Sequence, residues 1–145
     1  MRSFLLIALT VGLAIPIIGC SSKKSFSTRA TPVIETLVSA TKSWNGDSYS
    51  YPEGQAQMTL LRITAPVGFR TPVHTHPQPG VAYVVKGKLD CVVTATNTKV
   101  FSAGDSFATT SGDTPHYCES IGSEPAVVFV AYAGVEGQQV TVPFK

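Results

Sequence analysis

Turn-forming residues divide most of this chain into short segments. Clusters of glycine, proline, asparagine and aspartate recur roughly every 8–12 residues, the spacing typical of β-sandwiches and barrels. The chain holds 12 Gly and 10 Pro, so few stretches are long enough for an uninterrupted helix. Between the turns lie runs rich in β-branched and aromatic residues, such as MTLLRIT at 58–64 and AVVFVAYA at 126–133. The pattern therefore predicts an all-β domain.

The expected strands follow these runs. They cover residues 58–64, 81–87, 89–96, 99–102, 106–110, 116–120, 126–133 and, at an edge, 141–142. A β-branched segment at 32–44 ends at an expected turn over 45–47. Lys86-Gly87-Lys88 predicts a tight hairpin between two neighbouring strands.

The length of 145 residues suits one domain of ordinary size, which we place at 32–145. Only 14% of residues are charged and the formal net charge is +2, with the basic residues scattered along the chain. That distribution lacks the basic patch of a nucleic-acid-binding protein. No nucleic-acid partner is expected.

Residues 1–19 have the character of an export signal. Arg2 is followed by an uncharged apolar run from Phe4 to Ile18, which is too short for a comfortable transmembrane helix. The end of the run, Ile17-Ile18-Gly19-Cys20, resembles a bacterial lipobox. This resemblance implies cleavage before Cys20 and acylation of its thiol, with residues 20–31 as a polar tether. An ordinary signal peptide cut nearby is the alternative.

The resemblance also implies a location. The domain is expected outside the cytoplasm, anchored by lipid to the cell envelope, on the outer membrane facing the periplasm if the host is Gram-negative. Assigning Cys20 to acylation leaves two of the three cysteines, Cys91 and Cys118. They form either a disulfide, which an oxidising compartment permits, or two buried free thiols.

The chain has three histidines, His74, His76 and His116. The first two are separated by one residue, so on an extended segment both side chains point to the same face. Two imidazoles on one face can bind one metal ion, and neutral imidazole is a good ligand for Zn, Cu, Fe and Ni. An isolated His-x-His pair also fits two surface histidines.

The surroundings of the histidines resemble the two sequence motifs of the cupins. Gly68 to Gly87, with His74 and His76 between them, is similar to the first motif. Gly104 to Ser120, with His116, is similar to the second. The resemblance is to small single-domain bacterial cupins and implies an RmlC-like jelly-roll barrel, also called a double-stranded β-helix.

The resemblance further implies one divalent transition metal, held by His74, His76 and His116, with Fe, Mn, Zn and Ni not distinguished. It implies a homodimer and a small-molecule ligand as well. Gly80 stands where the cupin motif has its glutamate ligand, so we expect Gly80 to face the site and widen it. Gln78 and Cys118 are weaker candidates to replace that ligand.

Three classes of function remain open. One is a metal-dependent enzyme, such as an oxygenase or isomerase, acting on a small organic molecule. Another is a non-catalytic module that binds a metal or a small molecule, and the third is a metal-free structural cupin. Arg62 and Arg70 are candidates for holding an anionic substrate, although exposed arginines are common.

Overall fold

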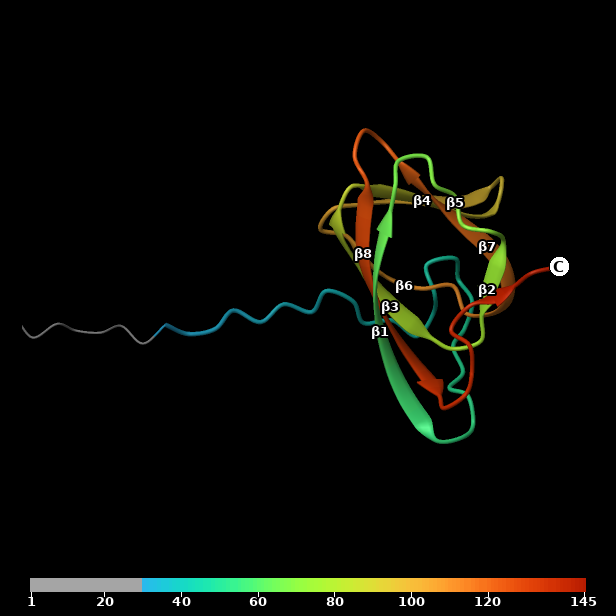
Figure 1. Cartoon of the computed structure of the whole chain (residues 1–145). Coiled ribbons are helices and arrows are strands. Elements are labelled where there is room, and N and C mark those ends of the chain that lie inside the picture. The colour runs from blue at the N-terminus through green and yellow to red at the C-terminus, as the bar shows by residue number, and fades with distance from the viewer. Residues whose placement is uncertain (1–29) are drawn as a thin grey trace, which may run out of the picture. The chain divides into compact units, whose positions relative to one another are not determined.

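The computed structural model describes residues 30–145, which form two antiparallel β-sheets without a helix (Figure 1). The four-stranded sheet has the order β1 (Ala56–Ala65), β8 (Ala126–Val135), β3 (Gly80–Lys86) and β6 (Ser106–Ala108). The five-stranded sheet has the order β5 (Asn97–Ser102), β4 (Lys88–Thr94), β7 (Gly112–Ile121), β2 (His74–His76) and β9 (Val142–Pro143). This arrangement confirms the predicted all-β jelly roll.

The predicted signal peptide, the lipidation site Cys20 and nearly all of the tether lie outside the described residues. In residues 30–145, no helix is long and apolar enough to cross a membrane.

The core lies between the sheets and is built by strict alternation. Along β8, Val128, Val130 and Tyr132 are each at most 5% exposed, whereas Phe129 between them is 37% exposed. On β3, Ala82 and Val84 alternate in the same way with exposed residues. A period of two places these side chains on the inner face of the sheet.

The predicted hairpin at Lys86-Gly87-Lys88 is wrong. β3 pairs with β6 and β8, whereas β4 pairs with β5 and β7, so the chain passes from one sheet to the other at Gly87. Gly87 has φ +73°, and a Cβ there would lie 2.7 Å from the carbonyl oxygen of Pro125. A glycine is needed here because the corner is crowded and left-handed, which a hairpin pattern does not reveal.

Two other elements differ from expectation. The segment 32–44 forms no strand and makes one isolated bridge, Lys42 to Ser48, around the predicted turn. β7 begins at Gly112 instead of residue 116 and continues through Pro115. A register shift between β2 and β7 accommodates this segment. The shift leaves His116 directly opposite His74.

Candidate metal centre

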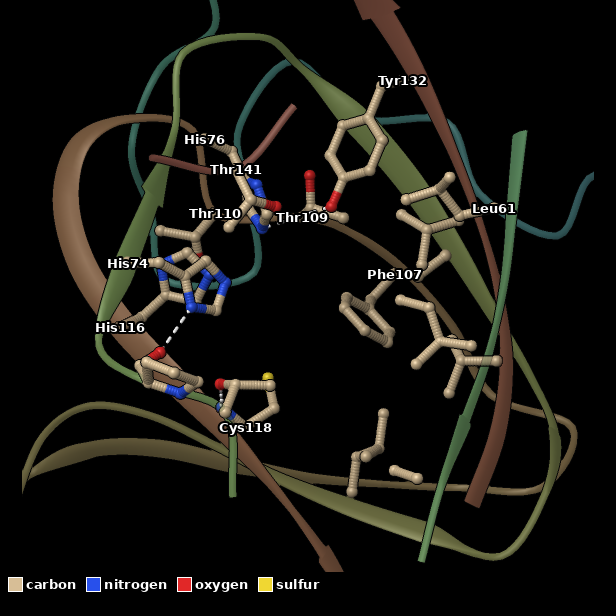
Figure 2. A pocket seen from close by; sticks show the side chains of 18 of the residues that line it. Leu61, His74, His76, Phe107, Thr109, Thr110, His116, Cys118, Tyr132 and Thr141 are labelled. Carbon is tan, nitrogen blue, oxygen red and sulfur yellow. Dashed lines mark hydrogen bonds between the residues drawn. The ribbon is translucent and has the colours of Figure 1, made fainter. Parts of the chain in front are cut away.

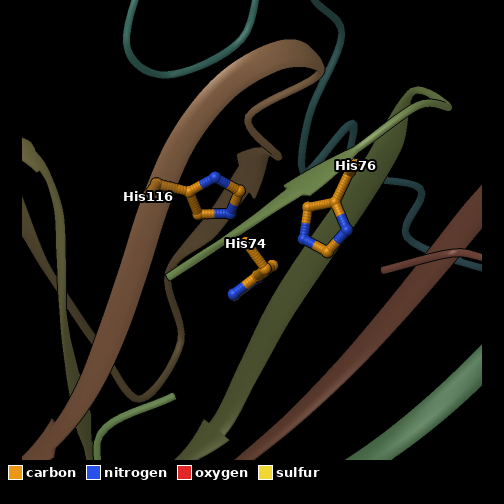
Figure 3. Close-up of side chains that lie close together, drawn as sticks. All are labelled: His74, His76 and His116. Atoms are coloured by element: carbon orange, nitrogen blue, oxygen red, sulfur yellow. The ribbon is translucent and has the colours of Figure 1, made fainter. Parts of the chain in front are cut away.

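The three histidines converge on one point inside the barrel. His74 and His76 project from the same face of β2, and His116 projects from β7 beside them (Figure 3). Each residue offers a ring nitrogen, and these three atoms lie within 4.8 Å of one another. The three side chains are between 4% and 9% exposed. Such a cluster of buried imidazoles has the dimensions of a metal site.

Backbone carbonyls set the tautomer of every ring. His74 and His116 each donate a hydrogen bond from Nδ1 to the carbonyl oxygen two residues earlier, at 2.7 and 3.2 Å. His76 donates from Nδ1 to the carbonyl oxygen of Val140 at 2.5 Å. Because a carbonyl oxygen only accepts, Nδ1 carries the proton in each ring and Nε2 keeps its lone pair. Metal-binding histidines in proteins are oriented in this way.

Burial also keeps the rings of His76 and His116 neutral. Desolvation lowers the pKa of His76 to about 4, despite the opposing effect of its bond to Val140. Desolvation likewise lowers the pKa of His116 to about 4. Both imidazoles are therefore uncharged near pH 7 and can act as ligands.

Tyr132 is the group that the sequence interpretation did not single out. Its side chain is 3% exposed, and its hydroxyl lies 3.2 Å from Nε2 of His76. Since Nδ1 of His76 carries the ring proton, the tyrosine hydroxyl donates this hydrogen bond. Residues 126–133 are apolar at every position, so the sequence does not show which face Tyr132 takes, and no motif links it to the histidines.

The expectation that Gly80 widens the site is wrong. Gly80 is not among the residues that line the cavity beside the histidines. A Cβ at position 80 would lie 2.7 Å from Cδ1 of Tyr132 and 2.9 Å from Oγ1 of Thr109. The tyrosine ring thus fills the space into which a side chain at 80 would project.

Gln78 does not take the place of the missing carboxylate. Its side chain is 2% exposed and its amide nitrogen donates to the carbonyl oxygens of Gln138 and Gln139, at 3.4 and 3.2 Å. The amide oxygen lies against Gly134, where a Cβ would come within 1.7 Å of it. Gln78 therefore ties the loop before β3 to the loop after β8, and the ligand hypothesis for it is wrong.

Cys118 does not supply a thiolate. It lies opposite Cys91 in the pairing of β4 with β7, and the two form a disulfide in the structure. Cys118 does line the cavity, but its sulfur is bonded to that of Cys91. The hypothesis of a cysteine ligand is therefore wrong, because a disulfide sulfur carries no negative charge.

Neither arginine reaches the site. Arg70 forms an ion pair with Glu119 at 2.6 Å, and its side chain is 57% exposed. Arg62 lies on β1 between two residues that line the cavity, Leu61 and Ile63, and is not itself part of the lining. Alternation therefore turns Arg62 away from the interior.

A cavity of about 300 Å³ opens beside the histidines. Figure 2 shows the histidines with Thr109, Thr110 and Thr141 on one side, and Leu61 and Phe107 on the other. The hydroxyl oxygens of Thr109 and Thr110 are buried and lack a hydrogen-bond partner among the described residues.

These residues fit a transition metal ion. Three imidazole ligands suit Zn²⁺ or Fe²⁺ and leave coordination positions open, as catalytic zinc sites do. The described residues of this cluster include no carboxylate, so its metal donors are the three histidines alone.

Comparison with known proteins supports a cupin fold. A family model described as "Cupin domain" matches residues 61–132. A mutant of Bacillus subtilis oxalate decarboxylase is similar in structure, with 25% identity and a TM-score of 0.51 over 60% of this chain and 24% of that chain. No curated protein matches the chain in sequence.

Two further structures share the fold. The DMSP lyase DddQ from Ruegeria pomeroyi has 20% identity and a TM-score of 0.51, over 59% of this chain and 42% of that chain. The polyketide cyclase RemF from Streptomyces resistomycificus has 16% identity and a TM-score of 0.51, over 63% of each chain. The described chain spans less than two thirds of each of these proteins.

Proposed function

Residues 61–132 form a cupin domain, and from that premise we propose that the protein binds one divalent transition metal through His74, His76 and His116. The observation that carries the proposal is the convergence of one ring nitrogen from each histidine, with each ring oriented by a backbone bond at Nδ1. A metal ion held by the three rings would take the place of the hydrogen bond that Nε2 of His76 accepts from Tyr132.

Different residues of the chain would have different roles at such a metal site. A bound metal would supply Lewis acidity or activate oxygen. The histidines hold the ion, and the hydroxyl of Tyr132, beside His76, can donate a hydrogen bond to an oxygen atom of a bound molecule. The apolar wall excludes water from the reacting group.

A non-catalytic binding module is the second candidate. No aspartate or glutamate is among the residues that line the cavity, so the described site lacks a carboxylate that could act as a general acid or base. Metal uptake and ligand binding are common to both candidates. Turnover of a bound organic molecule would distinguish the enzyme, an oxygenase or isomerase, from the module.

We also propose that the domain is held at the cell envelope by a lipid on Cys20. The support is the sequence Ile17-Ile18-Gly19-Cys20 after an apolar run. The disulfide between Cys91 and Cys118 agrees with this location, because disulfides persist in oxidising compartments outside the cytoplasm.

Elemental analysis tests the metal proposal. The full-length chain, reconstituted with Fe, Mn, Zn or Ni and desalted, should hold one ion per chain. His76→Ala and His116→Ala should each lower occupancy by roughly tenfold or more, because two imidazoles bind far more weakly than three. Tyr132→Phe is the matched control, since it alters the same site without removing a ligand, and it should retain the ion. Absence of metal from the folded wild-type chain after every reconstitution would refute the proposal.

A further inference from the structure

The cavity beside the histidines has two ends of unlike chemistry. The polar end holds the three histidines and the hydroxyl of Tyr132. The other walls are almost wholly apolar and include Leu61, Phe107 and Val128. Among the described residues, the lining contains no lysine, arginine, aspartate or glutamate.

This lining limits how many charges a ligand can carry. A group at the polar end meets the histidines and the hydroxyl of Tyr132. A charged group at the apolar end would meet Phe107 and Val128, which are 9% and 3% exposed and offer no counter-charge. Burial of an unpaired charge is strongly unfavourable. Arg70 cannot compensate because it is exposed and already paired with Glu119.

The head of the ligand belongs at the histidine end. Ring nitrogens of the three histidines converge there, and the hydroxyl of Tyr132 lies 3.2 Å from Nε2 of His76 (Figure 2). A polar group at this end can therefore find hydrogen-bonding or metal-binding partners, whereas the apolar walls offer none.

The volume limits the body of the ligand. An apolar cavity of about 150 Å³ accepts benzene. This cavity is about 300 Å³. It therefore has room for a ring with a branched substituent or for a molecule of similar bulk, on the order of ten carbon atoms.

We propose that this cavity takes an organic ligand with one polar head and an apolar body, and rejects ligands with a second charged group. The head lies at the histidine end, and the body lies against Leu61, Phe107 and Val128. The inference rests on the proposed function, because the metal would hold the head. Oxalate, which consists of two carboxylates and no apolar body, does not suit such a site.

A pair of shape-matched probes tests the inference. 4-Isopropylbenzoate and terephthalate have the same ring and head, and differ in whether the far substituent is an isopropyl group or a second carboxylate. Calorimetric titration of the zinc-loaded full-length chain, with a detergent blank, should show terephthalate binding roughly tenfold or more weakly. Equal or tighter binding of terephthalate would overturn the inference, as would failure of both probes to bind.

Lysine substitutions on β1 test where the apolar body of the ligand lies. Leu61→Lys adds a cation to the apolar wall, so it should weaken 4-isopropylbenzoate and reduce the preference over terephthalate. Ile63→Lys serves as a second variant that folds more readily, because Ile63 is 42% exposed. Leu60→Lys is the matched control: Leu60 is 67% exposed, lies next to Leu61 and does not line the cavity. The control should bind both probes as the wild type does, and equal effects of all three variants would contradict the placement.

A metal-free experiment separates this inference from the proposed function. The chelator-treated chain is titrated with 4-isopropylbenzyl alcohol, whose hydroxyl can donate to a free Nε2 atom. If that alcohol binds while no metal is ever taken up, the proposed function fails and the inference holds. If zinc binds but terephthalate binds as well as 4-isopropylbenzoate, the inference fails and the proposed function holds.

Discussion

Gly80 and Tyr132 face each other across β3 and β8, and the tyrosine ring occupies the space of the side chain that glycine lacks. The hydroxyl of the same tyrosine reaches His76. The position at which the cupin motif has a carboxylate is thus coupled to a phenol at the histidine cluster. Two positions far apart in the sequence must change together.

The first prediction concerns this pair. Gly80→Ala should lower the free energy of unfolding by about 1–3 kcal/mol, because its Cβ would overlap the ring of Tyr132 and the carbonyl oxygen of Ala131. The penalty should be smaller in a Tyr132→Leu background, where the ring contact is gone. Urea unfolding of the four proteins measures the coupling. An identical penalty in both backgrounds would contradict it.

Gly80→Glu gives the second prediction. The residue restores the carboxylate of the family motif, but the space for it is filled, so we expect lower stability and no gain in metal affinity. Zinc affinity from competition with a chelating dye measures this. Tighter zinc binding by the variant would show that the ring of Tyr132 moves aside easily.

The third prediction concerns pH and the metal-free chain. Burial lowers the pKa of His76 and His116 to about 4 from 6.5. Between these values the unfolded chain binds more protons than the native chain, so stability is fully present above pH 6.5 and is lost as the pH falls toward 4. The loss should amount to a few kcal/mol.

Urea unfolding at about pH 7.5 and about pH 5 measures this loss. His116→Gln, which cannot titrate in this range, should show a smaller difference between the two conditions. Equal stability of the wild type at both pH values would mean that the histidines are protonated in the folded chain.

The fourth prediction concerns the disulfide. Cys91 and Cys118 are 27 residues apart in sequence. A bridge that closes a loop of this size stabilises by about 3 kcal/mol in the chain-entropy model. The double variant Cys91→Ala with Cys118→Ala should therefore lose about that much free energy of unfolding. If reducing agent leaves the urea midpoint of the wild type unchanged, the bridge does not form in solution.

The fifth prediction concerns the anchor. Cys20→Ser removes the thiol that the lipobox resemblance assigns to acylation, so the variant should leave the detergent phase or retain its leader. Phase partitioning and the mass of the chain measure the two outcomes. The double variant of Cys91 and Cys118 controls for loss of any thiol and should partition as the wild type does. Unchanged partitioning of Cys20→Ser would contradict the anchor.

Most of the fold could be predicted from the sequence. The spacing of turns and the runs rich in β-branched and aromatic residues between them predicted an all-β barrel. The pairing partners were not predictable in the same way. Gly87 sits at a corner between sheets, and the crowding against Pro125 that requires glycine there comes from a distant segment.

The candidate site, like the fold, could be predicted from the sequence only in part. The spacing of His74 and His76 placed both on one face, and the second motif indicated His116, so the cluster could be predicted. Tyr132 could not, since its role depends on which residue β8 sets against β3. The interaction of Gln78 with the loop after β8 was hidden for the same reason.

The hydrogen bonds at the Nδ1 atoms affect how well this site tolerates substitution of the residues around it. All three acceptors are peptide carbonyls, two of them only two residues before the histidine they orient. Every amino acid carries that oxygen, so substitution of Thr114 or Val140 changes the side chain but not the group that orients the ring. The backbone path therefore fixes the orientation of the ligands. Few side-chain substitutions around these histidines would remove a group that orients them.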